Sequence, residues 1–262
     1  MVLLGKPAGK IEKYYADVVA RQGAMLFSLV DPDKTGDDNG AKMAKISCEA
    51  GADAIIVGGS IGAQGTLLDD TVKAIKDSVN VPVVLFPGNI SGVTKYADAV
   101  YFMSMLNSRD VYWLSTAQIQ GAPVVQRAGI EAIPTSYVVL EPGRAVGWIG
   151  NANLVPRDRP DLAYACALAA RYMGAHVLIS DSGSGAADPA PVELVAAIAK
   201  ACNNEVFYSY GGGIKNGSQA AEVIRAGAHG IQIGTAFEGG DVAEKVARVK
   251  KAILEEGRKR VK

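Results

Sequence analysis

Eight short apolar segments recur along this chain, and longer amphipathic stretches lie between most of them. Apolar runs of roughly four to eight residues indicate buried strands, whereas apolar residues at helical spacing indicate helices that bury one face. The alternation of the two patterns predicts parallel strands joined by helical crossovers. No shift in composition divides the chain, so we expect a single domain over residues 1–262. The expected strands are 24–30, 54–57, 83–86, 99–103, 135–140, 176–179, 205–209 and 230–233.

The number of strands and the length of 262 residues favour a closed barrel over an open sheet. We therefore expect an α/β fold in which eight parallel strands form a barrel and helices surround it. Thr66 and Asp69 have the spacing of a capping box variant, which predicts a helix start at that point. The expected helices lie near 10–22, 37–50, 66–78, 109–120, 160–173, 190–202, 217–226 and 241–258.

One connection between strands is too short for a regular crossover helix. The segment between Phe86 and Ala99 reads PGNISGVTKYAD and contains a proline and two glycines. We therefore expect the third helix to be missing or vestigial, and an apolar groove where the barrel wall stays uncovered. The candidate lining residues, most of which we expect to be ordinary core, are Phe86, Ile90, Val93, Tyr96, Tyr101, Phe102 and Met105.

Composition excludes several classes of partner. Lysine plus arginine and aspartate plus glutamate both number 27, so no long-range field attracts nucleic acid or an anionic membrane. No apolar run approaches the roughly 20 residues that cross a bilayer. The three cysteines are isolated and odd in number, which suits a reducing compartment. We therefore expect a soluble, cytoplasmic protein that binds anions locally.

Glycine-rich segments follow the last three expected strands. Gly211, Gly212 and Gly213 follow the seventh strand, Gly234 precedes Thr235 after the eighth, and Gly183-Ser184-Gly185 follows the sixth. Glycine lets backbone N–H groups approach phosphate oxygens, and strand ends in a barrel share one rim, so we expect a phosphate site. Tight turns explain one such segment but explain two converging segments less well. A dinucleotide site is discounted, because the expected acid, Glu205, lies at the wrong end of its strand.

The first two strands end in oxygen-bearing residues. Strand one runs into Asp31-Pro-Asp33-Lys34, and strand two runs into Gly58-Gly59-Ser60. A carboxylate and a hydroxyl at neighbouring strand ends suit Mg²⁺, which takes few protein oxygens and completes its shell with phosphate and water. A turn or a helix cap explains the Asp-Pro-Asp segment equally well. Closure of the barrel would place both strand ends next to the phosphate site.

Taken together, the motifs of this chain resemble those of one known family. The chain carries, over about residues 24–240, the segments SLVDPDK, IIVGGS, LFPGN, FMSMLNS, VLEPGRAVGWIGNANLVPRDRP, SDSGSGA, YGGGI and IQIGTAFE. Together they resemble the geranylgeranylglyceryl phosphate synthases of archaea, particularly the larger group in that family. The resemblance implies a modified TIM barrel in which an extended segment replaces the third helix. It also implies a Mg²⁺-dependent prenyltransferase of archaeal membrane phospholipid biosynthesis, which joins sn-glycerol 1-phosphate to geranylgeranyl diphosphate through an ether bond and releases diphosphate.

The same resemblance implies roles for individual residues. Asp31 and Ser60 take the metal positions. The family pattern has Tyr-Leu-Glu ahead of the Gly-Ser-Gly segment, whereas this chain has Ile179-Ser180-Asp181, so the tyrosine hydroxyl is absent and the acid is one methylene shorter. The residues implied to bind glycerol phosphate are Ile179, Ser180, Asp181, Ser182, Gly183, Ser184, Gly185, Gly211, Gly212, Gly234 and Thr235.

Three carboxylates are candidates for the chemistry. Asp31 would act through the metal, Asp181 would orient or accept the proton of the glycerol hydroxyl, and Glu141 is a second candidate acid. Glu141 is explained at least as well as a turn residue in Glu-Pro-Gly. His176 and His229 stand at the starts of strands, on the face of a barrel that serves stability, so we expect no catalytic role for either.

Other functions remain open. A heptaprenylglyceryl phosphate synthase-like enzyme would differ only in the length of its donor. A phosphosugar isomerase or synthase on the same barrel would explain the glycines but not Asp31 with Ser60. A noncatalytic phosphate-sensing barrel would bind ligand without releasing diphosphate. The resemblance also implies a homo-oligomer, for which Trp113 and Trp148 could be interface anchors or simply buried, and release of a lipid product would involve transient membrane contact.

Overall fold

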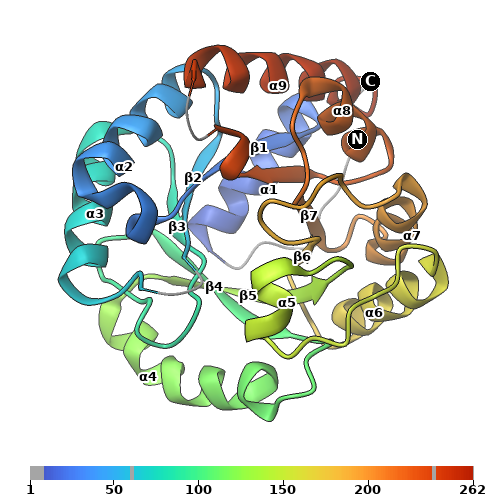
Figure 1. Cartoon of the computed structure of the whole chain (residues 1–262), viewed down its shortest axis with the longest axis horizontal. Coiled ribbons are helices and arrows are strands. Elements are labelled where there is room, and N and C mark those ends of the chain that lie inside the picture. Colours follow the sequence, from blue (N-terminus) through green and yellow to red (C-terminus); the bar gives the residue numbers. More distant parts are fainter. Residues whose placement is uncertain (1–8, 60–61, 238–239, 262) are drawn as a thin grey trace.

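The computed structural model describes residues 9–59, 62–237 and 240–261. Eight parallel strands pair in chain order, and β8 pairs with β1 to close the barrel. Figure 1 shows the strands at the centre of the molecule with helices around them. The prediction of a closed α/β barrel of the TIM type is therefore confirmed. The strands are β1 (Met25–Val30), β2 (Ala54–Val57), β3 (Val83–Leu85), β4 (Ala99–Met105), β5 (Glu131–Val139), β6 (Val177–Asp181), β7 (Phe207–Gly211) and β8 (Gly230–Ile233).

The predicted helices occur in the predicted order, with differences at their ends, and a short helix at Arg144–Ile149 was not predicted. Helix α2 begins at Pro32 rather than at 37, because proline fits the first turn and Asp31 is extended as the N-cap residue. Helix α3 has Gln64 as its N-cap and no side-chain cap, so the predicted capping box at Thr66 was wrong. The helices are α1 (Lys10–Gln22), α2 (Pro32–Glu49), α3 (Gly65–Ser78), α4 (Ala117–Ala128), α5 (Arg144–Ile149), α6 (Pro160–Tyr172), α7 (Val192–Cys202), α8 (Gly217–Arg225) and α9 (Val242–Gly257), with a π-helical turn η1 (Tyr112–Thr116) and a 3₁₀ turn η2 (Thr235–Phe237).

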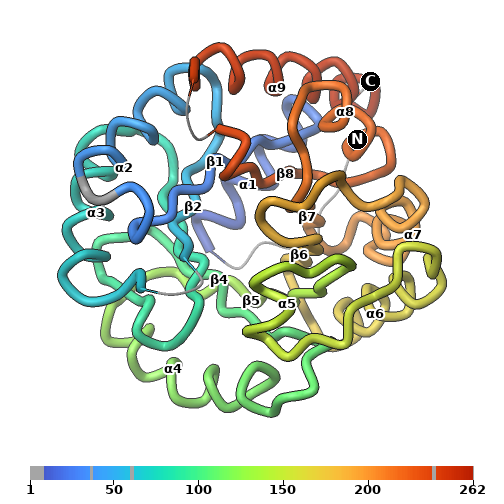
Figure 2. Tube along the Cα trace, in the orientation of Figure 1, coloured from blue at the N-terminus to red at the C-terminus, as the bar shows by residue number. Residues whose placement is uncertain are grey.

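The connection from β3 to β4 differs from its neighbours. Residues 86–98 consist of turns and bends, and β4 is the next regular element after β3. The tube in Figure 2 traces this stretch as a loop on the side of the barrel that carries β3 and β4. The two strands still pair in register, with Val84 opposite Ala99 and Leu85 opposite Val100. A short, irregular connection can therefore join parallel neighbours without breaking the barrel.

Two layers of apolar side chains stabilise the fold. One lies between the strands and the surrounding helices, and the other fills the barrel interior. Tyr15 of α1 belongs to the interior layer, where its ring centroid lies 5.2 Å from those of Phe27 and Phe207. Helix α1 therefore plugs the end of the barrel where the strands begin. Among the described residues, a cavity opens at the opposite end of the barrel, where the strands finish.

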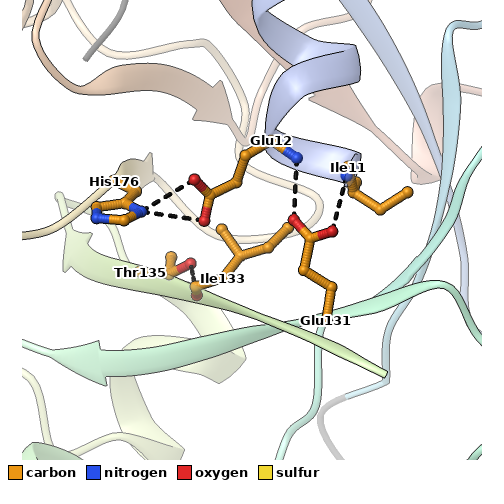
Figure 3. Close-up of polar contacts among 6 residues, drawn as sticks. All are labelled: Ile11, Glu12, Glu131, Ile133, Thr135 and His176. Atoms are coloured by element: carbon orange, nitrogen blue, oxygen red, sulfur yellow. Dashed lines mark hydrogen bonds and ion pairs between the residues drawn. The ribbon is translucent and has the colours of Figure 1, made fainter. Parts of the chain in front are cut away.

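Helix α1 is held in this position by a carboxylate from the barrel (Figure 3). The Glu131 side chain, at the start of β5, accepts hydrogen bonds from the backbone N–H groups of Ile11 and Glu12 at 2.8 and 3.0 Å. Free N–H groups and the positive end of the helix dipole both favour an anion there. The Glu12 carboxylate lies 3.0 Å from Nδ1 of His176, which joins the same helix to the start of β6.

In the part of the chain that the structure describes, no helix combines the length and the apolar character needed to cross a bilayer. Cys48, Cys166 and Cys202 are all free.

Candidate functional site

A cavity of about 330 Å³ opens at the carboxyl ends of the strands. Each strand contributes a lining residue at its end or within two residues of it, and the wall continues into α5 and η1. Catalytic and ligand-binding groups collect at this end of parallel α/β barrels, because loops of different strands converge there. The lining includes Leu29, Asp31, Gly58, Phe86, Met103, Met105, Trp113, Tyr137, Val146, Ile149, Asp181, Ser184, Gly185, Gly211, Gly212, Lys215, Gln232, Gly234 and Thr235.

One side of the cavity is polar and is built by the loops after β6, β7 and β8. The hydroxyl groups of Ser184 and Thr235 are 2.8 Å apart, so the loops after β6 and β8 are joined directly across the cavity rim. The glycine-rich loop after β7 lies in the same wall and leads into α8. Backbone N–H groups of glycine loops and a helix N-terminus suit an anion. The sequence prediction of converging glycine segments is therefore realised in the geometry.

Gly212 explains why this loop lacks side chains. Its φ is +89°, a conformation that residues with a Cβ rarely adopt. A Cβ at this position would lie 2.8 Å from Oδ1 of Asp181 and 2.8 Å from the backbone nitrogen of Ser182. Glycine thus lets the loop after β7 lie directly against the carboxylate at the end of β6. An anion held by this loop would sit next to that carboxylate.

Both carboxylate oxygens of Asp181 accept a hydrogen bond. The hydroxyl of Tyr137 donates to Oδ2 at 2.8 Å, and the backbone N–H of Gly183 donates to Oδ1 at 2.6 Å. Burial raises the pKa of Asp181 above its usual value, while the bonds from Gly183 and Tyr137 oppose that rise. A carboxylate with a raised pKa that lines a cavity has the properties of a group that exchanges protons with a ligand.

Asp31 lines the cavity where β1 ends. Its side chain is only 13% exposed, and its Oδ2 is paired with the ammonium group of Lys34. Oδ1 faces Gly58 at the end of β2, where a Cβ would stand 3.3 Å from that oxygen. Ser60, the second predicted metal ligand, lies outside the described residues. Asp31 therefore presents a carboxylate to the cavity next to the ends of β1 and β2.

The donor set bears on which metal could bind. Within residues 9–59, 62–237 and 240–261, no group of three or more His, Cys, Asp or Glu side chains could hold a metal ion. A structural or catalytic zinc site needs such a group. Mg²⁺ does not, because it is bound through one or two carboxylates together with substrate phosphates and water. A single carboxylate at Asp31, in the same cavity as the glycine-rich loops, fits that donor set.

The other side of the cavity is apolar. Phe86, Met103 and Met105 come from β3 and β4, Trp113 comes from η1, and the short helix α5 adds Val146 and Ile149. This wall includes the first three residues of the connection at residues 86–98, namely Phe86, Pro87 and Gly88. Of the predicted lining residues, Phe86 and Met105 line the cavity, whereas Tyr101 is buried in the barrel interior. Val93, Tyr96 and Phe102 pack against the core.

Several predicted residues point elsewhere. Ile179 is buried in the barrel interior. The hydroxyl of Ser180 is hydrogen bonded to that of Tyr208, at 2.8 Å, and the hydroxyl of Ser182 to that of Tyr210, at 3.0 Å. Ser180 and Ser182 are fully buried, so neither hydroxyl is available to a ligand. Gly183 acts through the N–H group that it donates to Asp181.

Glu141 also lies apart from the cavity lining. Its carboxylate accepts the backbone N–H of Arg157 at 3.2 Å, and a cis peptide bond joins Glu141 to Pro142. This arrangement agrees with the interpretation of Glu-Pro-Gly as a turn. Glu141 is therefore not among the residues that we assign to the chemistry.

Tyr137, Gln232 and Lys215 bring polar groups to the cavity, and none of the three was predicted to line it. Tyr137 stands in the middle of an apolar strand, where sequence alone indicates core. Gln232 of β8 is only 6% exposed, and its Nε2 atom has no hydrogen-bond partner among the described residues. Lys215 follows the glycine loop and brings a positive charge to the polar side. A polar residue in the alternating pattern of β8 was the one signal available for Gln232.

The sequence and the fold resemble those of known proteins. The PcrB family matches residues 17–254. The geranylgeranylglyceryl phosphate synthase of Pyrococcus horikoshii is 44% identical over 253 residues, which cover 97% of this chain and 94% of that relative. The synthase of the same name from Methanothrix thermoacetophila is 45% identical, over 94% of this chain and 96% of the relative. The crystal structure of (S)-3-O-geranylgeranylglyceryl phosphate synthase from Thermoplasma acidophilum, in complex with substrate sn-glycerol-1-phosphate, has a TM-score of 0.87 and 32% identity, covering 92% of this chain and 98% of that one.

Proposed function

The chain belongs to the PcrB family, and we propose that it is a geranylgeranylglyceryl phosphate synthase. It is a prenyltransferase that joins sn-glycerol 1-phosphate to geranylgeranyl diphosphate through an ether bond and releases diphosphate. Relatives at 44 and 45% identity over nearly the whole chain carry this name, and the similar Thermoplasma structure binds sn-glycerol 1-phosphate. The observation in this chain that supports the proposal best is the contact between Gly212 and Asp181, which would place an anion loop beside an acid.

We propose that the polar side of the cavity holds glycerol phosphate. The phosphate would lie on the loops of Gly211, Gly212, Gly234 and Thr235, where glycine backbones leave room for an anion. The Ser184 hydroxyl, which already contacts Thr235, would donate to the same phosphate. Lys215 would add a compensating charge.

In the proposed reaction the acceptor hydroxyl oxygen attacks C1 of the prenyl chain. A C–O bond forms at C1, the bond from C1 to the diphosphate oxygen breaks, and the diphosphate leaves with that electron pair. Asp181 accepts the proton of the hydroxyl, which the pKa raised by burial favours. Holding both substrates at one rim makes the attack effectively unimolecular.

Mg²⁺ is the expected cofactor, and Asp31 would hold it together with phosphate oxygens and water. When bound, the ion supplies Lewis acidity to the leaving diphosphate. Ser60 is kept as a proposed second ligand on the family resemblance alone.

The apolar side of the cavity would take the prenyl chain. Phe86, Met103 and Trp113 offer apolar surface on the wall next to residues 86–98. We propose that this loop stands in for the third crossover helix and so leaves room for a long hydrocarbon. Met105, Val146 and Ile149 would extend the same surface.

The proposal is tested by incubating the purified protein with Mg²⁺, radiolabelled sn-glycerol 1-phosphate and prenyl diphosphates of increasing length. We expect an organic-soluble product and release of diphosphate, with the highest kcat/KM for the twenty-carbon donor. A preference for a longer donor would indicate a heptaprenylglyceryl phosphate synthase-like enzyme. Binding of glycerol phosphate without diphosphate release would favour a sensor, and conversion of a phosphosugar would favour the isomerase class.

The role of Asp31 is tested by Asp31→Asn, which keeps the size of the side chain but removes its charge. We expect kcat to fall at least about 100-fold, since the charge on the leaving group would lose its counterion, while the melting temperature changes little. Asp33→Asn is the matched control, because Asp33 is exposed and is absent from the cavity lining. Unchanged Mg²⁺ dependence in Asp31→Asn would remove Asp31 from the metal role.

We also propose a homo-oligomer. Trp148 is 85% exposed on α5, and Tyr172 and Met173 are similarly exposed at the end of α6. Aromatic residues and methionine are enriched in protein interfaces relative to the rest of the protein surface. Sedimentation velocity of the wild-type protein tests this, and a monomer at micromolar concentration would contradict it.

A further inference from the structure

We propose that Tyr137 is a positioning residue for the reaction, because its phenol holds the Asp181 carboxylate in the orientation that receives the acceptor proton. This inference rests on the proposed function, in which Asp181 takes that proton. It adds a residue from β5 that no motif of the chain suggests.

The first observation is the way in which Asp181 is held. One donor serves each oxygen: the Tyr137 hydroxyl lies 2.8 Å from Oδ2 and the Gly183 N–H lies 2.6 Å from Oδ1. Turning the carboxylate about its terminal bond would lengthen both bonds. Two donors on opposite oxygens therefore fix the plane of the group, and its remaining lone pairs are available to the cavity that it lines.

The second observation is the register of the two strands. Tyr137 is opposite Ile179, and Val139 is opposite Asp181. The phenol therefore reaches diagonally to the next layer, a distance that only a long side chain can span. Ile179 has no polar atom, so the adjacent position on β6 cannot supply this hydrogen bond itself.

The third observation is that Tyr137 is itself immobile. Its side chain is only 2% exposed, and its ring packs edge to face against Phe86 with centroids 5.3 Å apart and planes at 80°. A donor that is fixed by packing can hold its partner without losing rotamer freedom during the reaction. The contact with Phe86 also links Tyr137 to the apolar wall where the donor would lie.

The protonation state of Tyr137 agrees with a donor role for its phenol. Burial, and then the charge of Asp181, raise the pKa of Tyr137 well above 10, so the phenol keeps its proton and donates it in a hydrogen bond only. The acceptor proton therefore ends on Asp181 and not on Tyr137. Besides Tyr137, the titratable groups around this carboxylate are Tyr210 on β7 and, in the lining of the same cavity, Asp31 and Lys215.

Tyr137→Phe tests the proposal, since it removes one oxygen atom and keeps the ring against Phe86. We expect kcat to fall about tenfold or more, within the range of general base effects, while KM for the prenyl donor stays within about twofold. Loss of the bond should raise the pKa of Asp181, so the acidic limb of the kcat profile should move to higher pH. A profile that superimposes on that of the wild type would overturn the proposal.

Tyr208→Phe is the matched control. Tyr208 is equally buried, and its hydroxyl also makes one side-chain hydrogen bond, to Ser180, but it does not line the cavity. We expect wild-type kcat and pH dependence for this variant. If Tyr208→Phe reproduced the kinetic effect of Tyr137→Phe, a general loss of packing would explain both, and the positioning role would be wrong.

A double-variant cycle shows whether Tyr137 acts through Asp181. In the Asp181→Asn background, Tyr137→Phe should change kcat by less than about twofold, because residues that act as a unit are not additive. An undiminished effect would contradict the proposal. The cycle is measured on residual activity at high enzyme concentration.

Failure of the proposed function is distinguishable from failure of this inference. If the wild type forms no ether product, the function fails, and the carboxyl ¹³C resonance of labelled Asp181 still reports the contact. We expect that resonance to titrate at higher pH in Tyr137→Phe than in the wild type. Equal titration of the two proteins would overturn the positioning role whatever the activity.

Discussion

Gly212 has no Cβ, and this lets two parts of the site lie in contact. The loop after β7 can lie against Asp181 only because no side chain separates them. The same residue has a positive φ, so two independent requirements select glycine there. Proximity of the anion loop and the acid is thus determined by a backbone feature, while the orientation of the acid is determined by Tyr137 and Gly183.

Gly212→Ala should disrupt this contact. We expect kcat/KM for glycerol phosphate to fall roughly 100-fold, since a displacement of about 1 Å has effects of that size, together with a stability loss of roughly 1–3 kcal/mol from backbone strain. Steady-state kinetics and denaturant unfolding measure the two effects. Gly174→Ala is the control, because Gly174 has φ +85° but no atom within 4 Å of its Cβ position. Equal activities of the two variants would mean that the contact has no functional role.

At the scale of the elements, most strands and helices could be predicted from the alternation of apolar runs with amphipathic stretches. Each predicted strand overlaps an observed one, because strands that are buried on both faces leave apolar runs in the sequence. The ends of the strands were predicted less accurately. Strand β5 begins at Glu131 rather than at 135, because its first residues pair with β4. Helix α5 was missed, since a short helix after Pro142 and Gly143 carries no periodic signal and depends on tertiary contacts.

The cap of α1 can be weakened by Glu131→Gln. The amide keeps one acceptor oxygen but loses the charge that faces the first turn, so we expect a loss of about 1 kcal/mol and a melting temperature lower by roughly 2–4 °C. Differential scanning calorimetry measures this change. Asp17→Asn on the exposed face of the same helix removes the pair with Lys13 and should cost little. A melting temperature no lower in Glu131→Gln than in Asp17→Asn would contradict the capping role.

The turn η1 supplies a residue that should affect only the prenyl donor. Trp113 lines the apolar wall and packs edge to face on Tyr112, with centroids 4.9 Å apart. In Trp113→Ala we expect KM for geranylgeranyl diphosphate to rise about tenfold through lost apolar contact, and KM for glycerol phosphate to stay within about twofold. Trp148→Ala, assayed at a concentration where its oligomeric state matches the wild type, is the comparison. If Trp113→Ala changed only the KM for glycerol phosphate, the prenyl chain would have to bind elsewhere.

At the scale of the whole molecule, closure of the barrel separates a stabilising end from a functional end. His229 belongs to the stabilising end, just before β8, and is only 2% exposed. Its Nδ1 accepts the N–H of Tyr208 at 3.0 Å, and its Nε2 lies 3.1 Å from the Asn204 side-chain oxygen. Burial, and then the charge of Arg260, lower its pKa to about 3. The ring is therefore neutral in the native protein, as expected for a residue without a catalytic role.

This histidine should make stability depend on pH. The unfolded chain binds a proton below about pH 6.5, whereas the native protein does not until about pH 3. Stability contributed by the neutral ring is thus present above pH 6.5 and is lost as pH falls, by up to about 1.4 kcal/mol per pH unit. Urea unfolding between pH 7 and 4 measures the slope. His229→Gln keeps an acceptor and a donor without titrating, so an equal slope in that variant would disprove the assignment.

The sequence by itself determined the barrel, the order of its elements and the glycine-rich loops of the proposed anion site. These features follow from local properties, because strand periodicity, helix periodicity and glycine content can all be read from short stretches of sequence. It also indicated Asp31 and Asp181 as acids at strand ends. It did not indicate that the hydroxyls of Ser180 and Ser182 turn away from the cavity, because the face of a strand that points inward depends on register.

Only the tertiary structure decided which groups meet. Tyr137 and Asp181 are 44 residues apart, and their hydrogen bond exists because β5 and β6 pair with one particular register. Ser184 and Thr235 are 51 residues apart and meet because the barrel closes. A contact between distant residues depends on the relative placement of whole strands, which packing of the interior fixes and no local pattern encodes.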